Sequence, residues 1–202
     1  MRTDESARLA SNGESYPDGE SVQVPTIGER GYVLQRVDAG FEVLYTRCVP
    51  IIDIDDGLDT SDPEHAGAIR QAAANLVKQL EIDRLGGIME CEAYRTRKGF
   101  RIIVTRVLTD GPVNAKSEWF AARCAVYGAD PVYQRLCQQR DAYAVRLSCK
   151  PKRMAPESPD ALLARHVCYL ISSAGRADID RYTMHVLRQH DKCVVDSSTP
   201  LA

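Results

Sequence analysis

Two aspartates separated by one residue are the strongest candidates for chemistry in this sequence. Asp53 and Asp55 stand at the end of the segment VPIIDID, whose β-branched residues predict a buried strand. On a strand, residues two apart project from the same face and lie about 7 Å apart along the backbone. Carboxylates at this spacing repel each other unless a cation lies between them, and Mg²⁺ or Mn²⁺ prefers oxygen ligands. The pair therefore predicts a metal site on a rigid element.

The same segment has a simpler interpretation. Asp53, Asp55 and Asp56 could end the strand and solvate a loop, because Asp56 followed by Gly57 is a common turn signal. A third carboxylate nearby would favour the metal site over the turn.

Two clusters of basic residues could contact phosphate. The clusters lie in YRTRKGFR at 94–101 and RLSCKPKR at 146–153, and their cations are Arg95, Arg97, Lys98, Arg101, Arg146, Lys150, Lys152 and Arg153. Cations beside metal-binding carboxylates suit a polyphosphate, because the metal bridges phosphate oxygens and Arg or Lys neutralises the remaining charge. A nucleic-acid backbone is the other natural occupant. A solvated basic turn is the alternative for the first cluster.

Length and composition allow one domain. The chain has 202 residues, of which 44% are hydrophobic and 27% charged, as is ordinary for a globular protein. No apolar run approaches the roughly 20 residues of a membrane-spanning helix, and the N-terminus lacks a signal-peptide pattern. We therefore expect a cytoplasmic protein without a membrane partner. The seven cysteines form no C-x-x-C pair and most fall inside apolar stretches, so we expect most of them to act as small hydrophobic residues and not as zinc ligands.

The elements that must position the candidate residues follow the order strand, helix, strand, strand, helix, strand. We predict them at 49–55, 62–85, 88–96, 100–108, 115–127 and 142–149, with a tight turn at 97–99 and a short helix starting at 130–131. This order is the split βαβ motif, so the fold class is α+β with a ferredoxin-like, RRM-like βαββαβ core. In that motif the first and third strands are neighbours, so Asp53 and Asp55 should share a face with Arg101.

The remaining sequence predicts flanking segments. Residues 1–27 read as a disordered arm, 28–155 as the core with an N-terminal hairpin at 32–37 and 41–45, and 191–202 as a flexible tail. Between them, 156–190 predicts two amphipathic helices at 161–173 and 177–189. We expect these helices to cover one side of the sheet, and a protein partner is the alternative.

The motifs and their order resemble the archaeo-eukaryotic primase and primase-polymerase superfamily. IIDID at 51–55 is similar to that family's hydrophobic strand with D-x-D, and RKGFRIIV at 97–104 to its small-Gly-x-His strand motif. Asp130, in GADPVY, could stand for its further acidic residue, and the stretch 146–150 resembles the basic stretch that follows in eukaryotic-type members. The resemblance covers about residues 49–153. Arg101 stands where the family has its histidine.

The resemblance implies a nucleotidyltransferase that adds nucleotides to a nucleic-acid chain. It implies Asp53, Asp55 and Asp130 as catalytic ligands of Mg²⁺ or Mn²⁺, Arg97, Lys98 and Arg101 as contacts to a nucleoside triphosphate, and Arg146, Lys150, Lys152 and Arg153 as contacts to nucleic acid. Arg101 can hold a phosphate as a bidentate donor but cannot share the chemistry of histidine. A catalytically degenerate module that only binds nucleotide or nucleic acid is therefore the alternative.

Overall fold

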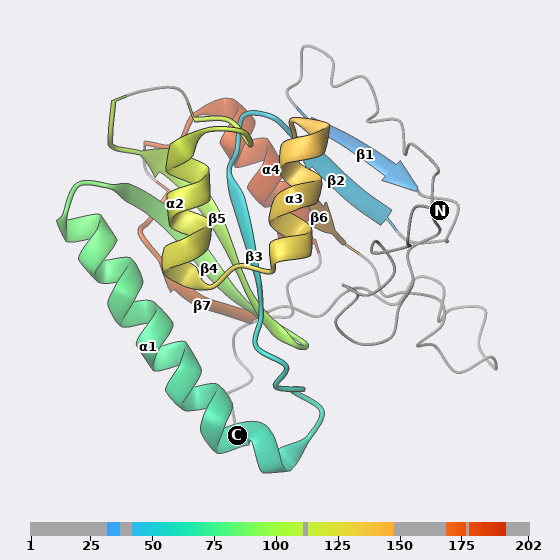
Figure 1. The fold of residues 1–202 in the computed structure, drawn as a ribbon, viewed down its shortest axis with the longest axis vertical. Helices are drawn as coiled ribbons and strands as arrows, with labels where there is room; N and C mark the ends of the chain where they lie inside the picture. The colour runs from blue at the N-terminus through green and yellow to red at the C-terminus, as the bar shows by residue number, and fades with distance from the viewer. Residues whose placement is uncertain (1–31, 37–41, 111–112, 148–168, 177, 193–202) are drawn as a thin grey trace, which may run out of the picture.

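The computed structural model describes residues 32–36, 42–110, 113–147, 169–176 and 178–192. The predicted arm at 1–27 lies outside these residues, as do Lys150, Lys152 and Arg153 and most of the predicted tail. The described residues form an α+β fold with two antiparallel sheets and four α-helices (Figure 1). None of these helices has the length and hydrophobicity to cross a membrane.

The larger sheet carries the two aspartates. Its strands lie in the order β3-β5-β4-β7, and their bounds are β3 (Ile51–Asp55), β5 (Gly99–Val107), β4 (Met89–Thr96) and β7 (Tyr169–Ser173). All neighbouring strands are antiparallel. The first and third predicted strands, β3 and β5, are neighbours, which confirms that expectation.

The turn between β4 and β5 brings the hairpin close to β3. Gly99 lies directly opposite Asp55, and a Cβ added to Gly99 would lie 1.7 Å from the carbonyl oxygen of Ile54. Gly99 is not among the positive-φ residues of the described chain, so the turn does not need glycine for a left-handed conformation. Glycine is needed at this position because the two strands approach closely.

The smaller sheet contains the predicted N-terminal hairpin. Its order is β1-β2-β6, with β1 (Tyr32–Arg36), β2 (Glu42–Thr46) and β6 (Tyr143–Arg146). The ferredoxin-like prediction placed β6 beside β3 in the main sheet, and this placement is wrong. β6 pairs with β2, where Val145 faces Leu44 and both side chains are fully buried. Burial of this apolar pair stabilises the β2–β6 arrangement.

The C-terminal segment differs from the predicted helix pair. A helix at 161–173 is wrong for residues 169–173, which form β7 along β4. The segment YLISS contains aromatic and β-branched residues that favour a strand, and β4 supplies the backbone partners that a five-residue strand needs. Residues 161–168 lie outside the described part of the chain. The second predicted helix is confirmed as α4 (Arg181–Asp191), which Asp180 caps by accepting from the amides of Tyr182 and Thr183.

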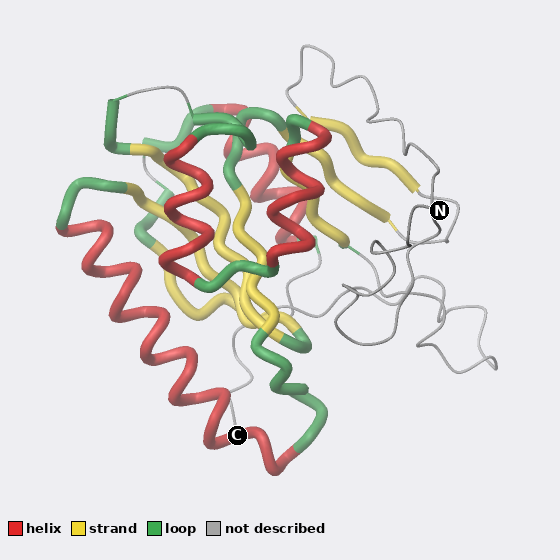
Figure 2. The backbone as a smooth tube through the Cα atoms, in the orientation of Figure 1, coloured by secondary structure: helices red, strands yellow, loops and turns green. Residues whose placement is uncertain are grey.

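Helices lie on both faces of the larger sheet (Figures 1 and 2). The helices α1 (Ala66–Leu85), preceded by a short 3-10 turn at Pro63–His65, and α2 (Glu118–Tyr127) lie on one face, and α4 lies on the other. The helix α3 (Pro131–Arg140) lies beside β3, where the Tyr133 hydroxyl donates to the carbonyl oxygen of Ile51 at 2.9 Å. The first residue of β3 therefore lies beside α3.

Cysteines contribute to this core as the sequence predicted. Cys91, Cys124 and Cys137 are free and buried, and burial raises their pKa values to about 12, 12 and 11. These thiols act as small apolar side chains.

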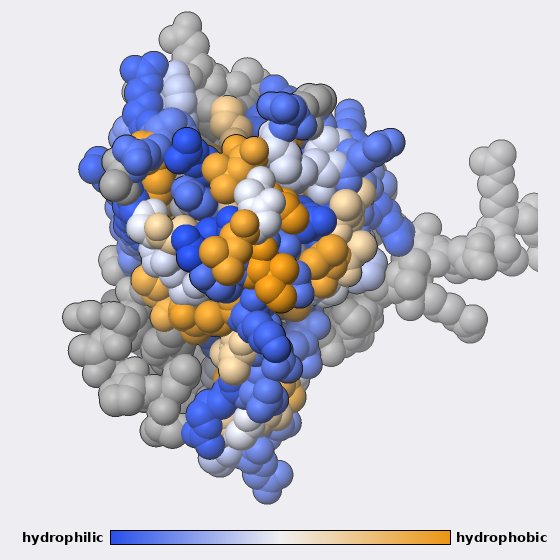
Figure 3. All heavy atoms as spheres, turned by 90° about the vertical axis from the view of Figure 1, so that its left-hand side faces the viewer, coloured by the Kyte–Doolittle hydropathy of each residue, from blue (hydrophilic) through white to orange (hydrophobic). Residues whose placement is uncertain are grey.

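The outer surface around α1 is not uniformly polar. Figure 3 shows apolar side chains gathered among charged ones on this side of the molecule. Within the described part of the chain, the substantially exposed large apolar residues are Ile82, Leu85, Leu108 and Val126.

Candidate functional site

Asp53 and Arg101 form an ion pair between neighbouring strands. The register of β3 and β5 places the two residues directly opposite each other, and Arg101 Nε donates to Asp53 Oδ1 at 3.1 Å. Arg101 is only 2% exposed, whereas the Asp53 side chain is 38% exposed. A buried cation therefore lies behind a carboxylate that solvent reaches.

The Arg101 guanidinium also connects β5 with two further elements. Its Nη1 donates to the carbonyl oxygen of Arg146, the last residue of β6, at 3.4 Å. The same nitrogen lies 3.3 Å from Nε2 of His190 on α4. Direct contact between Arg101 and a triphosphate stays a prediction, but Arg101 holds several elements together around Asp53.

Asp55 lies at the exposed end of β3. Residues two apart on a strand share a face, so Asp55 lies on the same side of β3 as Asp53. Its Oδ1 accepts from the amide of Gly57 at 3.0 Å. This short turn agrees with the simpler interpretation of the segment, and it involves one of the two oxygens of Asp55.

The backbone of Asp130 lies beside the backbone of Asp53. Its amide donates to the carbonyl oxygen of Asp53 at 3.0 Å. Its carboxylate caps α3, because Oδ1 accepts from the amide of Val132 at 2.8 Å. The proposed third acidic residue is therefore next to β3, and its carboxylate has a structural role as a helix cap.

Asp53 and Asp55 suit an open metal site better than a closed metal cage. Within the described ranges, no three Asp, Glu, His or Cys side chains converge as a closed metal cage would require. Mg²⁺ more commonly binds through one or two carboxylates together with water and substrate phosphates. Asp53 and Asp55 fit this second kind of site, because they share a face of β3 and both reach solvent.

The basic hairpin lies beside the segment that follows Asp55. The amide of Asp56 donates to the carbonyl oxygen of Lys98 at 3.1 Å. The amide of Thr60 donates to the carbonyl oxygen of Arg97 at 2.9 Å. Arg97 Nε contacts both carboxylate oxygens of Asp59 at 3.1 Å, and this hydrogen bond holds the pKa of Asp59 well below its usual range. The Arg97 side chain remains 47% exposed.

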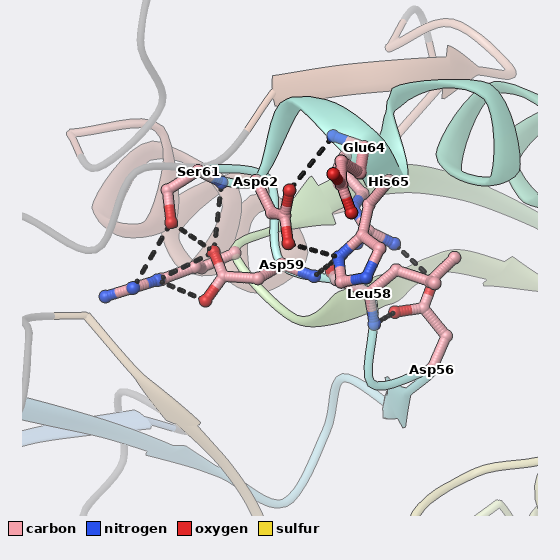
Figure 4. Close-up of polar contacts among 9 residues, drawn as sticks. Asp56, Leu58, Asp59, Ser61, Asp62, Glu64 and His65 are labelled. Atoms are coloured by element: carbon pink, nitrogen blue, oxygen red, sulfur yellow. Dashed lines mark hydrogen bonds and ion pairs between the residues drawn. The ribbon is translucent and has the colours of Figure 1, made fainter.

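Polar contacts hold the loop between β3 and α1 (Figure 4). His65 Nδ1 accepts from the amide of Asp59 at 3.1 Å, and the Ser61 hydroxyl donates to Asp59 Oδ1 at 2.7 Å. The fully buried Arg95 donates to the carboxylate of Asp56 and to the carbonyl oxygen of Leu58. The buried Arg95 side chain thus attaches the loop to β4.

The structure brings most of the predicted site residues to one region. Backbone or side-chain contacts connect Asp53 with Arg101 and Asp130, Arg101 with Arg146, and Arg97 and Lys98 with the loop that follows Asp55. Lys150, Lys152 and Arg153 lie outside the described residues.

Sequence reasoning missed a second polar network on this face of the sheet. Arg176 binds both oxygens of Glu92 at 2.5 and 2.6 Å and Asp191 at 2.7 Å. Glu92 is 1% exposed, in the apolar strand MECEAY. A buried carboxylate requires hydrogen-bonding or cationic partners, so Glu92 itself was the signal for such a network.

Comparisons of the chain with protein-family models, curated proteins and solved structures found no match. The likeness to primase-polymerases therefore rests on the motifs between residues 49 and 153.

Proposed function

We propose that this chain is a metal-dependent nucleotidyltransferase of the primase-polymerase type. The observation that carries the proposal is the register that sets Asp53 opposite Arg101, with Asp55 on the same side of β3. Two solvent-accessible carboxylates next to a basic hairpin suit a metal-chelated triphosphate.

Each part of the region has a role in this proposal. Asp53 and Asp55 would hold Mg²⁺ or Mn²⁺, with Asp130 beside them, and the bound ion would neutralise triphosphate charge and favour attack by a 3′-hydroxyl. Arg97 and Lys98, on the hairpin, would neutralise the phosphates that extend from this point. Arg101 would orient Asp53 and, from its buried position, place a positive charge near the same phosphates. The product would be a chain longer by one nucleotide, with pyrophosphate released.

The proposal extends to the fold and the partners. The order β3-β5-β4 matches three of the four strands of a ferredoxin-like, RRM-like sheet, which supports that kinship. The partners would be a nucleoside triphosphate and a nucleic acid, the latter bound by Arg146 and the basic residues that follow it. A cytoplasmic location belongs to the same proposal.

A second candidate function is binding without catalysis. Its specific support is the ion pair itself, because Arg101 already neutralises one of the two carboxylates. A degenerate module of this kind would bind nucleotide or nucleic acid in a salt-sensitive way and would not turn over.

Nucleotide incorporation distinguishes the two functions. The full chain is incubated with a primed and an unprimed single-stranded template, labelled nucleoside triphosphates, and Mg²⁺ or Mn²⁺. We expect extension products with the wild-type chain and none with the double variant Asp53→Ala, Asp55→Ala. Glu81→Ala, which removes an exposed carboxylate from α1, is the matched control and should retain activity.

Each outcome selects one function. Equal incorporation by the wild-type and double-variant chains would remove the assigned site. Salt-sensitive binding of template or nucleotide with no incorporation at any metal concentration would select the binding module.

A further inference from the structure

A row of side chains crosses the larger sheet beneath α4. Asp53 on β3 is opposite Arg101 on β5, and Arg101 is opposite Tyr94 on β4. Tyr94 and Arg101 are nearly fully buried, whereas Asp53 lies at the open end of the row. Any element that fixes the buried members of the row also affects the carboxylate at its end.

His190 on α4 contacts two members of this row. Its Nε2 lies 3.3 Å from Arg101 Nη1, and its ring lies 4.4 Å from the ring of Tyr94. A guanidinium has only donors and stays protonated in proteins, so Nε2 of His190 must be the acceptor in this contact. A histidine that accepts through Nε2 is the neutral tautomer with its proton on Nδ1.

The position of His190 is itself fixed by neighbouring contacts. It is fully buried, and the adjacent Asp191 accepts from the Tyr94 hydroxyl at 3.2 Å and from Arg176 at 2.7 Å. Tyr94 also donates to Glu92 at 2.5 Å, and Arg176 binds the same carboxylate. The last turn of α4 is thus attached to β4 through Asp191, the residue next to His190.

We infer that His190 is a positioning residue for the candidate site, acting through Arg101 on the carboxylate of Asp53. This inference rests on the proposed function, because it assigns His190 to the site at Asp53 and Asp55. The Arg101 guanidinium has partners on β3, β6 and α4, and loss of the α4 partner removes one of the contacts that fix its orientation. Asp53 then loses the fixed geometry that a metal–phosphate complex requires.

Mn²⁺ binding to the full chain, followed by electron paramagnetic resonance, tests the inference. We expect His190→Leu to weaken Mn²⁺ binding about tenfold, as is typical when a group that orients a metal ligand is lost. His190→Gln should retain most of the affinity, because its amide oxygen can accept from Arg101. His185→Leu, at an exposed histidine of the same helix, is the matched control and should bind as the wild-type chain does.

A second pair of variants covers the case in which His190→Leu does not fold. His190→Asn keeps a polar side chain but is too short to reach Arg101, so it should bind Mn²⁺ more weakly than His190→Gln. Circular dichroism confirms that both are folded. A purely structural role predicts that affinity follows thermal stability, whereas a positioning role predicts that Gln rescues affinity and Asn does not.

The outcomes separate the inference from the proposed function. A wild-type chain that binds no Mn²⁺ would contradict both. Wild-type affinity in the folded His190→Leu or His190→Asn chain, lost only on substitution of Asp53 and Asp55, would overturn the inference and leave the proposed function standing.

Discussion

Asp83 and Asp53 each face an arginine, and their surroundings differ. Asp83, near the end of α1, is 2% exposed and accepts from Arg123 Nη1 and the Tyr127 hydroxyl of α2, both at 2.7 Å. Asp53 accepts from Arg101 at 3.1 Å, and its side chain is 38% exposed. Asp83 is enclosed by donors from the protein, whereas Asp53 is open to solvent on one side.

The difference separates a structural carboxylate from one that can take a ligand. An enclosed charge depends on its protein partners, because loss of either member leaves a buried group without compensation. A carboxylate open on one side can exchange water for a metal or phosphate at little cost to the fold. Substitutions in the two regions should therefore affect different properties.

The largest effect on stability is expected at Asp83. Asp83→Ala should lower the free energy of unfolding by about 3 kcal/mol, because Arg123 and Tyr127 lose their shared acceptor inside the helix interface. Asp53→Ala should cost less, about 2 kcal/mol, because its own carboxylate is partly hydrated, while the buried Arg101 loses its ionised partner and keeps its contacts to β6 and α4. Urea denaturation measures both. Equal losses would erase the distinction between the two regions.

Glu92 is a buried carboxylate near the candidate site, and its charge should make the stability of the fold depend on pH. Burial alone would raise the pKa of Glu92, but the hydrogen bonds from Arg176 and Tyr94 bring it below its usual value. A lowered pKa in the folded state means that the ionised group stabilises the fold above the unfolded pKa of about 4.3, and that this contribution is lost as pH falls through the folded pKa.

Glu92→Gln should therefore cost about 2 kcal/mol at pH 7. The difference from the wild-type chain should shrink as the pH falls below the unfolded pKa and then through the lowered pKa of folded Glu92, where the wild-type carboxyl takes up its proton. Thermal or urea unfolding across this range measures the difference. A difference that stays constant with pH would mean that Glu92 does not act through its charge.

The smallest effect on stability is expected at the hairpin. Arg97→Ala removes an exposed ion pair with Asp59 and should cost about 0.5 kcal/mol, with the loss reduced further at high salt. The same variant should bind nucleoside triphosphate more weakly if the hairpin contacts phosphate. Unfolding and equilibrium nucleotide binding are measured on the same sample. Unchanged nucleotide affinity would mean that Arg97 holds the loop through Asp59 and does not contact phosphate.

The central strands of this fold could be predicted from sequence because their signals are local. The run ending in Asp53 and Asp55, the turn at 97–99 and the helix start at 130–131 each specify an element within a few residues. The adjacency of β3 and β5 followed from the order of those elements. The contact between Asp53 and Arg101 could then be expected from their shared face.

The remaining features depend on contacts distant in sequence. The segment 169–173 forms β7 because β4 offers it a neighbour, and β6 joins β2 because Val145 and Leu44 bury each other. The contact of His190 with Arg101 joins residues 89 positions apart, and no local pattern specifies it. Tertiary packing decided these arrangements over local preference.

Paramagnetic broadening by Mn²⁺ tests the central claim most directly. Sub-stoichiometric Mn²⁺ is added to the isotopically labelled full chain with a nucleoside triphosphate, and the backbone amide signals are followed by NMR. We predict selective broadening centred on Asp53 to Asp55 and on the facing residues Gly99 to Arg101, abolished in the Asp53→Ala, Asp55→Ala chain. Broadening centred elsewhere, or the same pattern in the double variant, would contradict a metal–phosphate site on this face of β3.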